Sequence, residues 1–312
     1  MNLDEVKSTL RGPMIPVITN LNDDLAVDHD AIADNVRTIV ARGIVRGRGV
    51  LLAVGAGGDF PMLTVEERKA AARTIVEAAS GKTPIVVGAQ DTNPQVSIEL
   101  ARYSEGIGAY AVQMSPTFYY ESSDEDCLRV FQAVHDATST LALMIYNTWW
   151  ESYDMSLEQV RRLAELERCV ALKWSTPAGG AAHLKGVAAM AGSLAVVDNG
   201  GMQVSTHMLG GTGYVTHLAT VWPEHDLAVW DLLESGDYVA AQQKITAVNW
   251  PWGDFRSKMW KRTAAESPVV KAALEICGRP GGPTRLPARA LSASECDELR
   301  GLLRRIGVPD VR

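Results

Sequence analysis

Eight short apolar segments alternate along the chain with amphipathic segments, and this alternation limits the fold more than any other feature. Most of the apolar segments are continuous runs, which is typical of strands covered on both faces in a parallel sheet. The predicted strands lie at residues 13–19, 49–55, 84–90, 110–116, 141–147, 169–175, 194–200 and 213–219. Eight strands with helices between them predict an α/β fold, a (β/α)8 TIM barrel.

The segments between the predicted strands carry helix-start signals. Asp28 precedes one amphipathic run, and Thr64 opens another with Glu67 three residues later, the pattern of a capping box. Ser123 and Ser156 precede two more. A doubly wound open sheet is the alternative, but eight repeating units and the lack of an early GxGxxG sequence favour the barrel.

The last part of the chain is helical in pattern and contains no further predicted strand. Three helices are expected there, at residues 224–248, 267–277 and 292–306. The expected organisation is a barrel at residues 1–222 and a C-terminal helical extension, packed on the barrel, at residues 223–312. No segment between them has the composition of a linker, so we do not expect the extension to be an independent domain.

Composition argues against several classes of function. The formal net charge of −7 disfavours nucleic acid as the main partner, because phosphate binding requires clustered Lys and Arg. The polar N-terminus lacks the apolar core of a signal peptide, and no apolar run reaches the roughly 20 residues that span a bilayer. The four cysteines form no CxxC pair and lie near no His at metal-ligand spacing. We therefore expect a cytoplasmic protein that acts on a small molecule. We expect it to have no metal site and no membrane partner.

Lys173 is the strongest candidate for a catalytic residue. It lies near the end of the sixth predicted strand, in the otherwise apolar run CVALKWS, and active sites of such barrels lie at the C-terminal ends of the strands. Burying an ammonium is costly, so a lysine inside a barrel favours the neutral amine, which is a nucleophile toward carbonyls. From its position alone, a lysine that extends to solvent is an equally good interpretation.

Tyr146, at the end of the fifth predicted strand, favours the catalytic interpretation of Lys173. A phenol on the neighbouring strand could transfer protons as a carbinolamine forms and collapses. A tyrosine at a strand end is by itself more often a packing residue. The two residues on adjacent strands together predict a nucleophile with a proton carrier.

At this point the sequence resembles the dihydrodipicolinate synthase/N-acetylneuraminate lyase family of class I aldolases. The matching stretches are GAGGDFPMLTVEERK, MIYN, ALKWS and SPVVKAALEICGRPGGPTRLP, in the family's order over nearly the whole chain. The resemblance implies a TIM barrel with C-terminal helices and a homo-oligomer, a dimer or a tetramer of two tight dimers. It implies catalysis without a metal or an organic cofactor, with Lys173 as the Schiff-base lysine and Tyr146 as the proton-relaying tyrosine.

The loop after the second predicted strand departs from the family pattern. Members of the family that this sequence resembles usually have two hydroxyl residues there, which hold a carboxylate and take part in the proton relay. This chain has Ala56 and Gly57 instead. The backbone N–H groups of Gly57 and Gly58 could bind an oxyanion, since glycines allow a nest-like turn, and a plain tight turn is an equal alternative. In the same loop Asp59 replaces the family's glutamate, and we expect it to order the loop.

The segment YNTWWESY departs from the family as well. Dihydrodipicolinate synthases have an arginine shortly after the tyrosine, whereas the nearest match here is Glu151, which would repel a carboxylate substrate. Trp149 and Trp150 follow Tyr146, and Trp174 follows Lys173. These aromatic side chains could stack on a flat substrate, although strand alternation predicts that Trp174 points away from the barrel interior.

The remaining candidate substrate-binding residues come from three other strand ends. The family often supplies a tyrosine from the partner subunit at the position of Tyr119 or Tyr120. Asn147 follows Tyr146 directly. Val215 and His217 lie in the eighth predicted strand.

These residues predict a lyase in which Lys173 forms an imine with a 2-oxo acid or related ketone. The imine then serves as an electron sink for aldol chemistry or for loss of water. An aromatic or bulky aldehyde is the expected partner. Two alternatives remain open at this stage, a sugar-acid dehydratase of the same family and a barrel that binds a ligand without catalysis.

Overall fold

A computed structural model describes residues 3–312 of the chain and contains eight parallel strands in a closed barrel, in the order β1 to β8. The strands are β1 (Gly12–Pro16), β2 (Val50–Ala53), β3 (Ile85–Gly88), β4 (Ala111–Met114), β5 (Ala142–Tyr146), β6 (Cys169–Trp174), β7 (Ala195–Asp198) and β8 (Gly213–Val215). Nearly every strand residue is buried, as the continuous apolar runs predicted. The barrel prediction is confirmed, and the doubly wound alternative is wrong.

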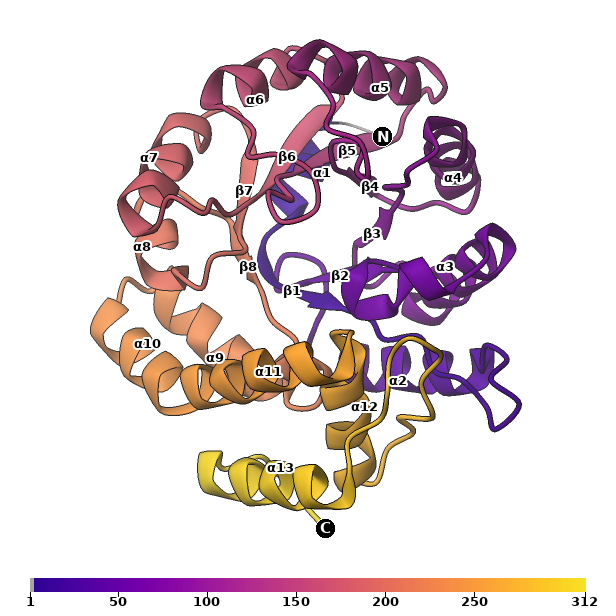
Figure 1. Ribbon diagram of the computed structural model, residues 1–312. Coiled ribbons are helices and arrows are strands. Elements are labelled where there is room, and N and C mark those ends of the chain that lie inside the picture. The colour runs from indigo at the N-terminus through magenta and orange to yellow at the C-terminus, as the bar shows by residue number, and fades with distance from the viewer. Residues whose placement is uncertain (1–2) are drawn as a thin grey trace. The chain divides into compact units, whose positions relative to one another are not determined.

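The chain divides into two compact units. The first consists of the described residues up to Met14 together with Pro84–Val215. It contains most of the strands. Its helices are α1 (Leu3–Thr9), α4 (Pro94–Gly106), α5 (Asp124–Asp136), α6 (Leu157–Ala164), α7 (Gly180–Met190) and α8 (Gln203–Met208), and α4 to α8 lie outside the strands (Figure 1).

The second unit joins Ile15–Thr83 to Thr216–Arg312. The segment before Thr83 contains α2 (His29–Ala41), the 3-10 helices η1 (Ala56–Gly58) and η2 (Phe60–Met62), and α3 (Val65–Ala79). The segment after Thr216 contains η3 (Leu218–Thr220), α9 (Pro223–Glu234), α10 (Tyr238–Lys244), the π-helix η4 (Ile245–Asn249), α11 (Trp250–Thr263), α12 (Ser267–Ile276) and α13 (Ala293–Ile306). The boundary expected at residue 223 coincides with the start of α9 and stays a prediction as a domain division.

The helices begin at the residues that the local sequence signals predicted. The Asp28 carboxylate caps α2 by accepting from the Ala31 N–H. Thr64 and Glu67 form the predicted capping box of α3. Each such cap satisfies N–H groups that a helix end leaves without an intrahelical partner.

The C-terminal helices are only partly as predicted. The expected single helix at residues 224–248 is wrong, because Gly236 adopts a φ of 78° between α9 and α10. Helix α11 was missed altogether. Pro251 fits in this helix because it lies in the first turn, where a backbone N–H has no intrahelical acceptor and is not needed.

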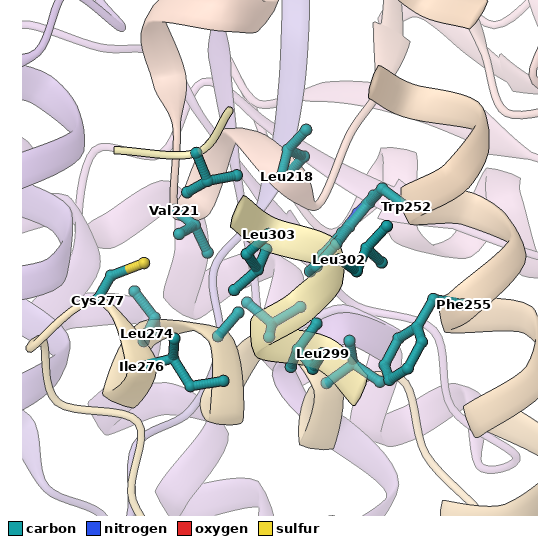
Figure 2. Packing of buried hydrophobic residues seen from close by; sticks show 14 of the residues in the cluster. Leu218, Val221, Trp252, Phe255, Leu274, Ile276, Cys277, Leu299, Leu302 and Leu303 are labelled. Carbon is teal, nitrogen blue, oxygen red and sulfur yellow. The ribbon is translucent and has the colours of Figure 1, made fainter. Parts of the chain in front are cut away.

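The C-terminal helices pack through a buried apolar cluster in the second unit (Figure 2). The cluster joins η3 to α11, α12 and α13, and its labelled members include Leu218, Trp252, Phe255, Leu274 and Leu303. Truncating one such buried leucine costs about 2–5 kcal/mol in general. These helices are therefore held to the segment that follows β8.

No helix within residues 3–312 is long and apolar enough to cross a membrane.

Candidate functional site

The structure places Lys173 and Tyr146 side by side on neighbouring strands of the first unit. Tyr146 of β5 is in register with Lys173 of β6, so both side chains leave the sheet on the same face. The Lys173 Nζ lies 4.0 Å from the centre of the Tyr146 ring. Lys173 is 5% exposed, so it does not extend to solvent as the alternative interpretation held.

This setting is suited to amine chemistry. A buried amine loses most of its hydration, which disfavours its charged form, while the face of an aromatic ring is one of the few weakly polar neighbours that can stabilise that form. The neutral amine is the nucleophile toward a carbonyl. The two residues are close enough for the phenol to act in the same reaction.

Trp174 is a packing residue. Its buried indole Nε1 donates to the His183 carbonyl of α7 at 3.1 Å. A Cβ atom at Gly186 of the same helix would lie 2.4 Å from that nitrogen, so residue 186 must be glycine for the indole to fit. The prediction that Trp174 points away from the interior is confirmed, and Trp174 is not available for stacking on a substrate.

Trp149 and Trp150 form an aromatic series that extends outward from Tyr146. The Trp150 and Tyr146 ring centres are 5.8 Å apart, and those of Trp149 and Trp150 are 5.3 Å apart, both in edge-to-face geometry. Each tryptophan is 38% exposed. The series therefore joins the buried pair to the surface of the first unit.

Asn147 forms hydrogen bonds within the first unit, and its contact with a substrate stays a prediction. It is fully buried, and its Nδ2 donates to Asp154 Oδ1 at 2.6 Å and to the Ser175 carbonyl at 2.8 Å. Its Oδ1 accepts from the Met155 N–H at 3.0 Å. Asn147 therefore donates both of its amide protons, and these hydrogen bonds hold the Trp149–Trp150 loop to the end of β6.

Ser175 is a candidate that sequence reasoning missed. It lies two residues after Lys173, and strand alternation predicts that it faces the same side. Its Oγ is buried and has no hydrogen-bond partner within the described residues. A buried hydroxyl without a partner calls for an explanation, and the alternation of β6 could have identified it.

Tyr119 and Tyr120 are the most exposed of the predicted site residues, at 83% and 80%. Their rings contact each other in edge-to-face geometry at 5.0 Å. Tyr119 has a φ of 83°, an uncommon conformation for a residue with a side chain. Their assignment to a partner subunit stays a prediction.

In the second unit, Ala56–Gly58 forms the 3-10 turn η1 after β2. The Gly58 N–H donates to the Gly55 carbonyl at 2.9 Å, and the Gly58 carbonyl accepts from Thr19 Oγ1 at 2.7 Å. The expectation that the Gly58 N–H is directed at an oxyanion does not hold in this conformation, because the turn already uses it. The Gly57 N–H stays the candidate from this loop for binding an oxyanion.

Asp59 anchors the end of this turn to α12. Its Oδ2 accepts from the Ser267 hydroxyl at 2.6 Å and lies 3.7 Å from Lys271 Nζ. Burial raises the pKa of Asp59 and lowers the pKa of Lys271, in each case against the attraction between the two groups. The expectation that Asp59 orders the loop agrees with these contacts.

Of the two β8 candidates, Val215 lies in register with Met14 of β1 and is partly buried. His217 lies two residues beyond it, in the second unit. Its Nε2 is 3.0 Å from Glu266 Oε2, and it would lie 3.1 Å from a Cβ atom at Gly57. The His217–Glu266 contact spans 49 residues of sequence and was not predicted.

Comparison with known proteins gives consistent matches along the chain. Residues 9–306 match the Dihydrodipicolinate synthetase family. The 4-hydroxy-tetrahydrodipicolinate synthase 1 of Halalkalibacterium halodurans is 28% identical over 292 residues, 91% of this chain and 92% of that protein.

Two solved structures show the likeness of fold. A prophage protein of the dihydrodipicolinic acid synthase family from E. coli K12, in complex with pyruvate, has a TM-score of 0.86 at 24% identity and covers 96% of this chain and 99% of its own. CdNal from Clostridium difficile, in complex with mannosamine, has a TM-score of 0.83 at 17% identity, with coverages of 95% and 99%.

Proposed function

Because the chain belongs to the dihydrodipicolinate synthetase family, we propose that it is a Schiff-base-forming lyase with Lys173 as the nucleophile. Members of the family are lyases, and we propose the same class of reaction for this chain. The observation that carries the residue assignment is the buried Lys173 amine 4.0 Å from the Tyr146 ring. A barrel that only binds a ligand would have no need to bury an amine beside a phenol.

The proposed reaction begins when the Lys173 amine attacks the carbonyl carbon of a 2-oxo acid or related ketone. The resulting carbinolamine loses water to give an iminium ion. The bond between the carbons α and β to the iminium carbon then breaks. The hydroxyl on the β-carbon loses its proton to give the aldehyde, and the electron pair of the broken bond forms the enamine. Protonation of the enamine and hydrolysis of the imine return the ketone product and the free amine.

Tyr146 is the proposed proton carrier of these steps. The carbinolamine oxygen must gain a proton to leave as water, and the hydroxyl that becomes the aldehyde must lose one. We assign both transfers to the Tyr146 phenol. The buried Ser175 hydroxyl is the proposed hydrogen-bond partner of the carbinolamine oxygen.

The aromatic series beside Tyr146 supports an aromatic or bulky aldehyde as the second part of the substrate. Trp149 and Trp150 offer ring surface that leads away from the reacting amine. Partly exposed tryptophans are typical of sites that bind flat apolar groups. Glu151, which is exposed on the same loop, would repel a carboxylate there.

A carboxylate-bearing second substrate, as in lysine biosynthesis, is therefore disfavoured. A sugar-acid dehydratase remains the second candidate within this chemistry, because the same iminium ion can expel a hydroxyl. The two are separated by their products. Aldol cleavage gives an aldehyde and a shorter oxo acid, whereas dehydration gives water and an oxo acid that keeps all of its carbons.

A panel of 2-oxo acids with aryl, alkyl and hydroxylated side chains tests the proposal. Each is incubated with the protein, reduced with borohydride and examined by mass spectrometry of the intact protein. We expect a single adduct whose mass identifies the ketone half of the substrate. A panel that gives no adduct would contradict the proposal.

A further inference from the structure

The Trp149–Trp150 loop, residues 147–155, is closed by hydrogen bonds between its two ends. Asn147 Nδ2 donates to Asp154 Oδ1 at 2.6 Å, and Asn147 Oδ1 accepts from the Met155 N–H at 3.0 Å. Asn147 is fully buried, so its amide is a fixed point within the first unit. Compact surface loops whose ends lie together in this way are frequently functional.

Asp154 also joins this loop to the loop that follows β6. Its second oxygen, Oδ2, accepts from Thr176 Oγ1 at 2.9 Å. Thr176 lies three residues after Lys173, and Asn147 directly follows Tyr146. A carboxylate suits this position because each of its oxygens accepts hydrogen bonds independently. One side chain thus binds the loops that follow both strands of the proposed catalytic pair.

Tyr153, the residue before Asp154, packs into the first unit. Its hydroxyl oxygen is buried. Burial, followed by the neighbouring Cys127 of α5, raises the pKa of the Tyr153 phenol. This end of the loop therefore lies against α5, whereas the part that reaches the surface carries Trp149 and Trp150, each 38% exposed.

The two tryptophans are too exposed for burial alone to fix their positions. Their rings contact each other, and the Trp150 ring contacts Tyr146. If the loop were open, binding of a ligand would have to order both side chains, and that loss of conformational freedom would lower the affinity. Closure of the loop orders its backbone before a ligand binds and so reduces this cost.

We propose that Asp154 is a positioning residue that sets the preference for an aryl substrate by holding the Trp149–Trp150 loop in its binding geometry. The inference rests on the proposed function, because it takes an aryl 2-oxo acid bound at Lys173 as the substrate. Asp154 acts through the two tryptophans and does not contact the substrate. Its loss should weaken the binding of an aryl compound more than the binding of a small alkyl analogue.

The test compares two 4-hydroxy-2-oxo acids that differ only at carbon 4, which carries a phenyl group in one and a methyl group in the other. Each is trapped on the protein with cyanoborohydride, and the total modified protein is followed by mass spectrometry. The measured quantity is the concentration of the acid that gives half of the maximal trapping rate. For the native protein this concentration should be lower for the phenyl compound.

Asp154→Ala should raise the half-saturating concentration of the phenyl compound by at least about fivefold, because two tryptophans must then be ordered on binding. The value for the methyl compound should rise by less than about twofold, which also shows that the variant folds. Asp154→Asn should restore most of the preference, because an amide can accept from Asn147 and donate to the Thr176 hydroxyl. Glu158→Ala is the matched control, since it removes an exposed carboxylate from α6, outside the loop.

A protein with both Trp149→Ala and Trp150→Ala separates positioning from a general loosening of the fold. If Asp154 acts through the tryptophans, adding Asp154→Ala to this protein should change the value for the phenyl compound by less than about twofold. A further rise of about fivefold would overturn the inference, because Asp154 would then act by another route.

Equal effects of Asp154→Ala on the phenyl and methyl compounds would also overturn the inference and leave the proposed function standing. A native protein that does not distinguish the two compounds would overturn it together with the proposal of an aromatic substrate. Trapping of neither compound would contradict the Schiff-base proposal itself and this inference with it.

Discussion

At the scale of single residues, the account depends on the contact between Lys173 and Tyr146. Both lie at the ends of paired strands, and both are buried. Tyr146→Phe keeps the ring that packs against Nζ and removes only the hydroxyl. It should lower kcat by about 10²–10⁴-fold, the usual range for a general acid–base group, with the melting temperature almost unchanged. A fall in kcat of less than about threefold would mean that the phenol only packs.

Trp150 provides the second prediction at this scale. Its ring contacts Tyr146 and is still partly exposed, so it is the tryptophan closer to the reacting amine. Trp150→Ala should raise KM for an aryl substrate by at least about tenfold through lost burial and ring contact. KM for a small aliphatic substrate should barely change. If aryl and aliphatic substrates respond alike to Trp150→Ala and to Trp149→Ala, the aromatic-substrate proposal should be abandoned.

Residue identity alone could predict some of these roles and not others. The places of Lys173 and Tyr146 at neighbouring strand ends were predictable from the barrel pattern, and their catalytic roles are proposals. The hydrogen bonds from Asn147 to Asp154 and Ser175 were not predicted, because nothing in its sequence position shows these partners. The partnership of His217 with Glu266 depends on tertiary packing and has no local signal.

At the scale of elements, the contact between β6 and α7 sets the orientation of the strand that carries Lys173. Trp174 fits against α7 only because residue 186 is glycine. Gly186→Ala places a Cβ atom against the indole and should destabilise the fold by about 1–3 kcal/mol, the usual cost of overpacking. Urea unfolding measures this.

Gly301→Ala is the control, since a Cβ atom at that position of α13 meets nothing within 4 Å. Alanine in a helix interior is favoured over glycine by roughly 0.5–1 kcal/mol, so this variant should be as stable as the native protein or more stable. A Gly186→Ala protein with the stability of the Gly301→Ala protein would show that the indole moves without cost.

The start of α3 gives a prediction about acid stability. Glu67 accepts the Thr64 N–H and pairs with Arg285 at 2.6 Å, and hydrogen bonding from Arg285 lowers the Glu67 pKa from 4.5 to about 2. A lowered carboxyl pKa stabilises the folded state above pH 4.5, and that stabilisation is lost as the pH falls from 4.5 toward 2.

Glu67→Gln should therefore cost about 1 kcal/mol at pH 7, a value that allows for partial exposure of the pair. The difference from the native protein should shrink as the pH is lowered through this window. Glu66→Gln is the control, because Glu66 is 81% exposed and its ion pair with Lys69 lies along the helix. A Glu67→Gln deficit that stays constant down to pH 3 would contradict the assignment of the stabilisation to this carboxylate.

The elements themselves were predictable where the pattern is local. Continuous apolar runs predicted the strands, and Thr64 with Glu67 predicted the start of α3. The C-terminal part was less predictable, since Gly236 divides an apparently continuous helical pattern and α10 passes into α11 through a π-helix. The π-helix and α11 contribute Val248 and Trp252 to the apolar cluster with Leu274 and Leu303, and no short window of sequence contains these contacts.

At the scale of the whole molecule, the closed eight-stranded barrel and the family follow from a pattern that extends over most of the chain. The substrate does not follow from that pattern, because it depends on loop residues in which this chain departs from the family. Ala56, Gly57 and Glu151 are the departures that matter most.

The imine on Lys173 is the central claim, and peptide mapping after borohydride reduction tests it most directly. The protein is reduced in the presence of a 2-oxo acid that gives an adduct, and then digested. The account predicts that the added mass lies on the peptide that contains Lys173, that Lys173→Arg abolishes it because guanidinium stays protonated, and that Lys185→Arg on α7 leaves it intact. An adduct on another lysine, or one that persists in Lys173→Arg, would contradict the account.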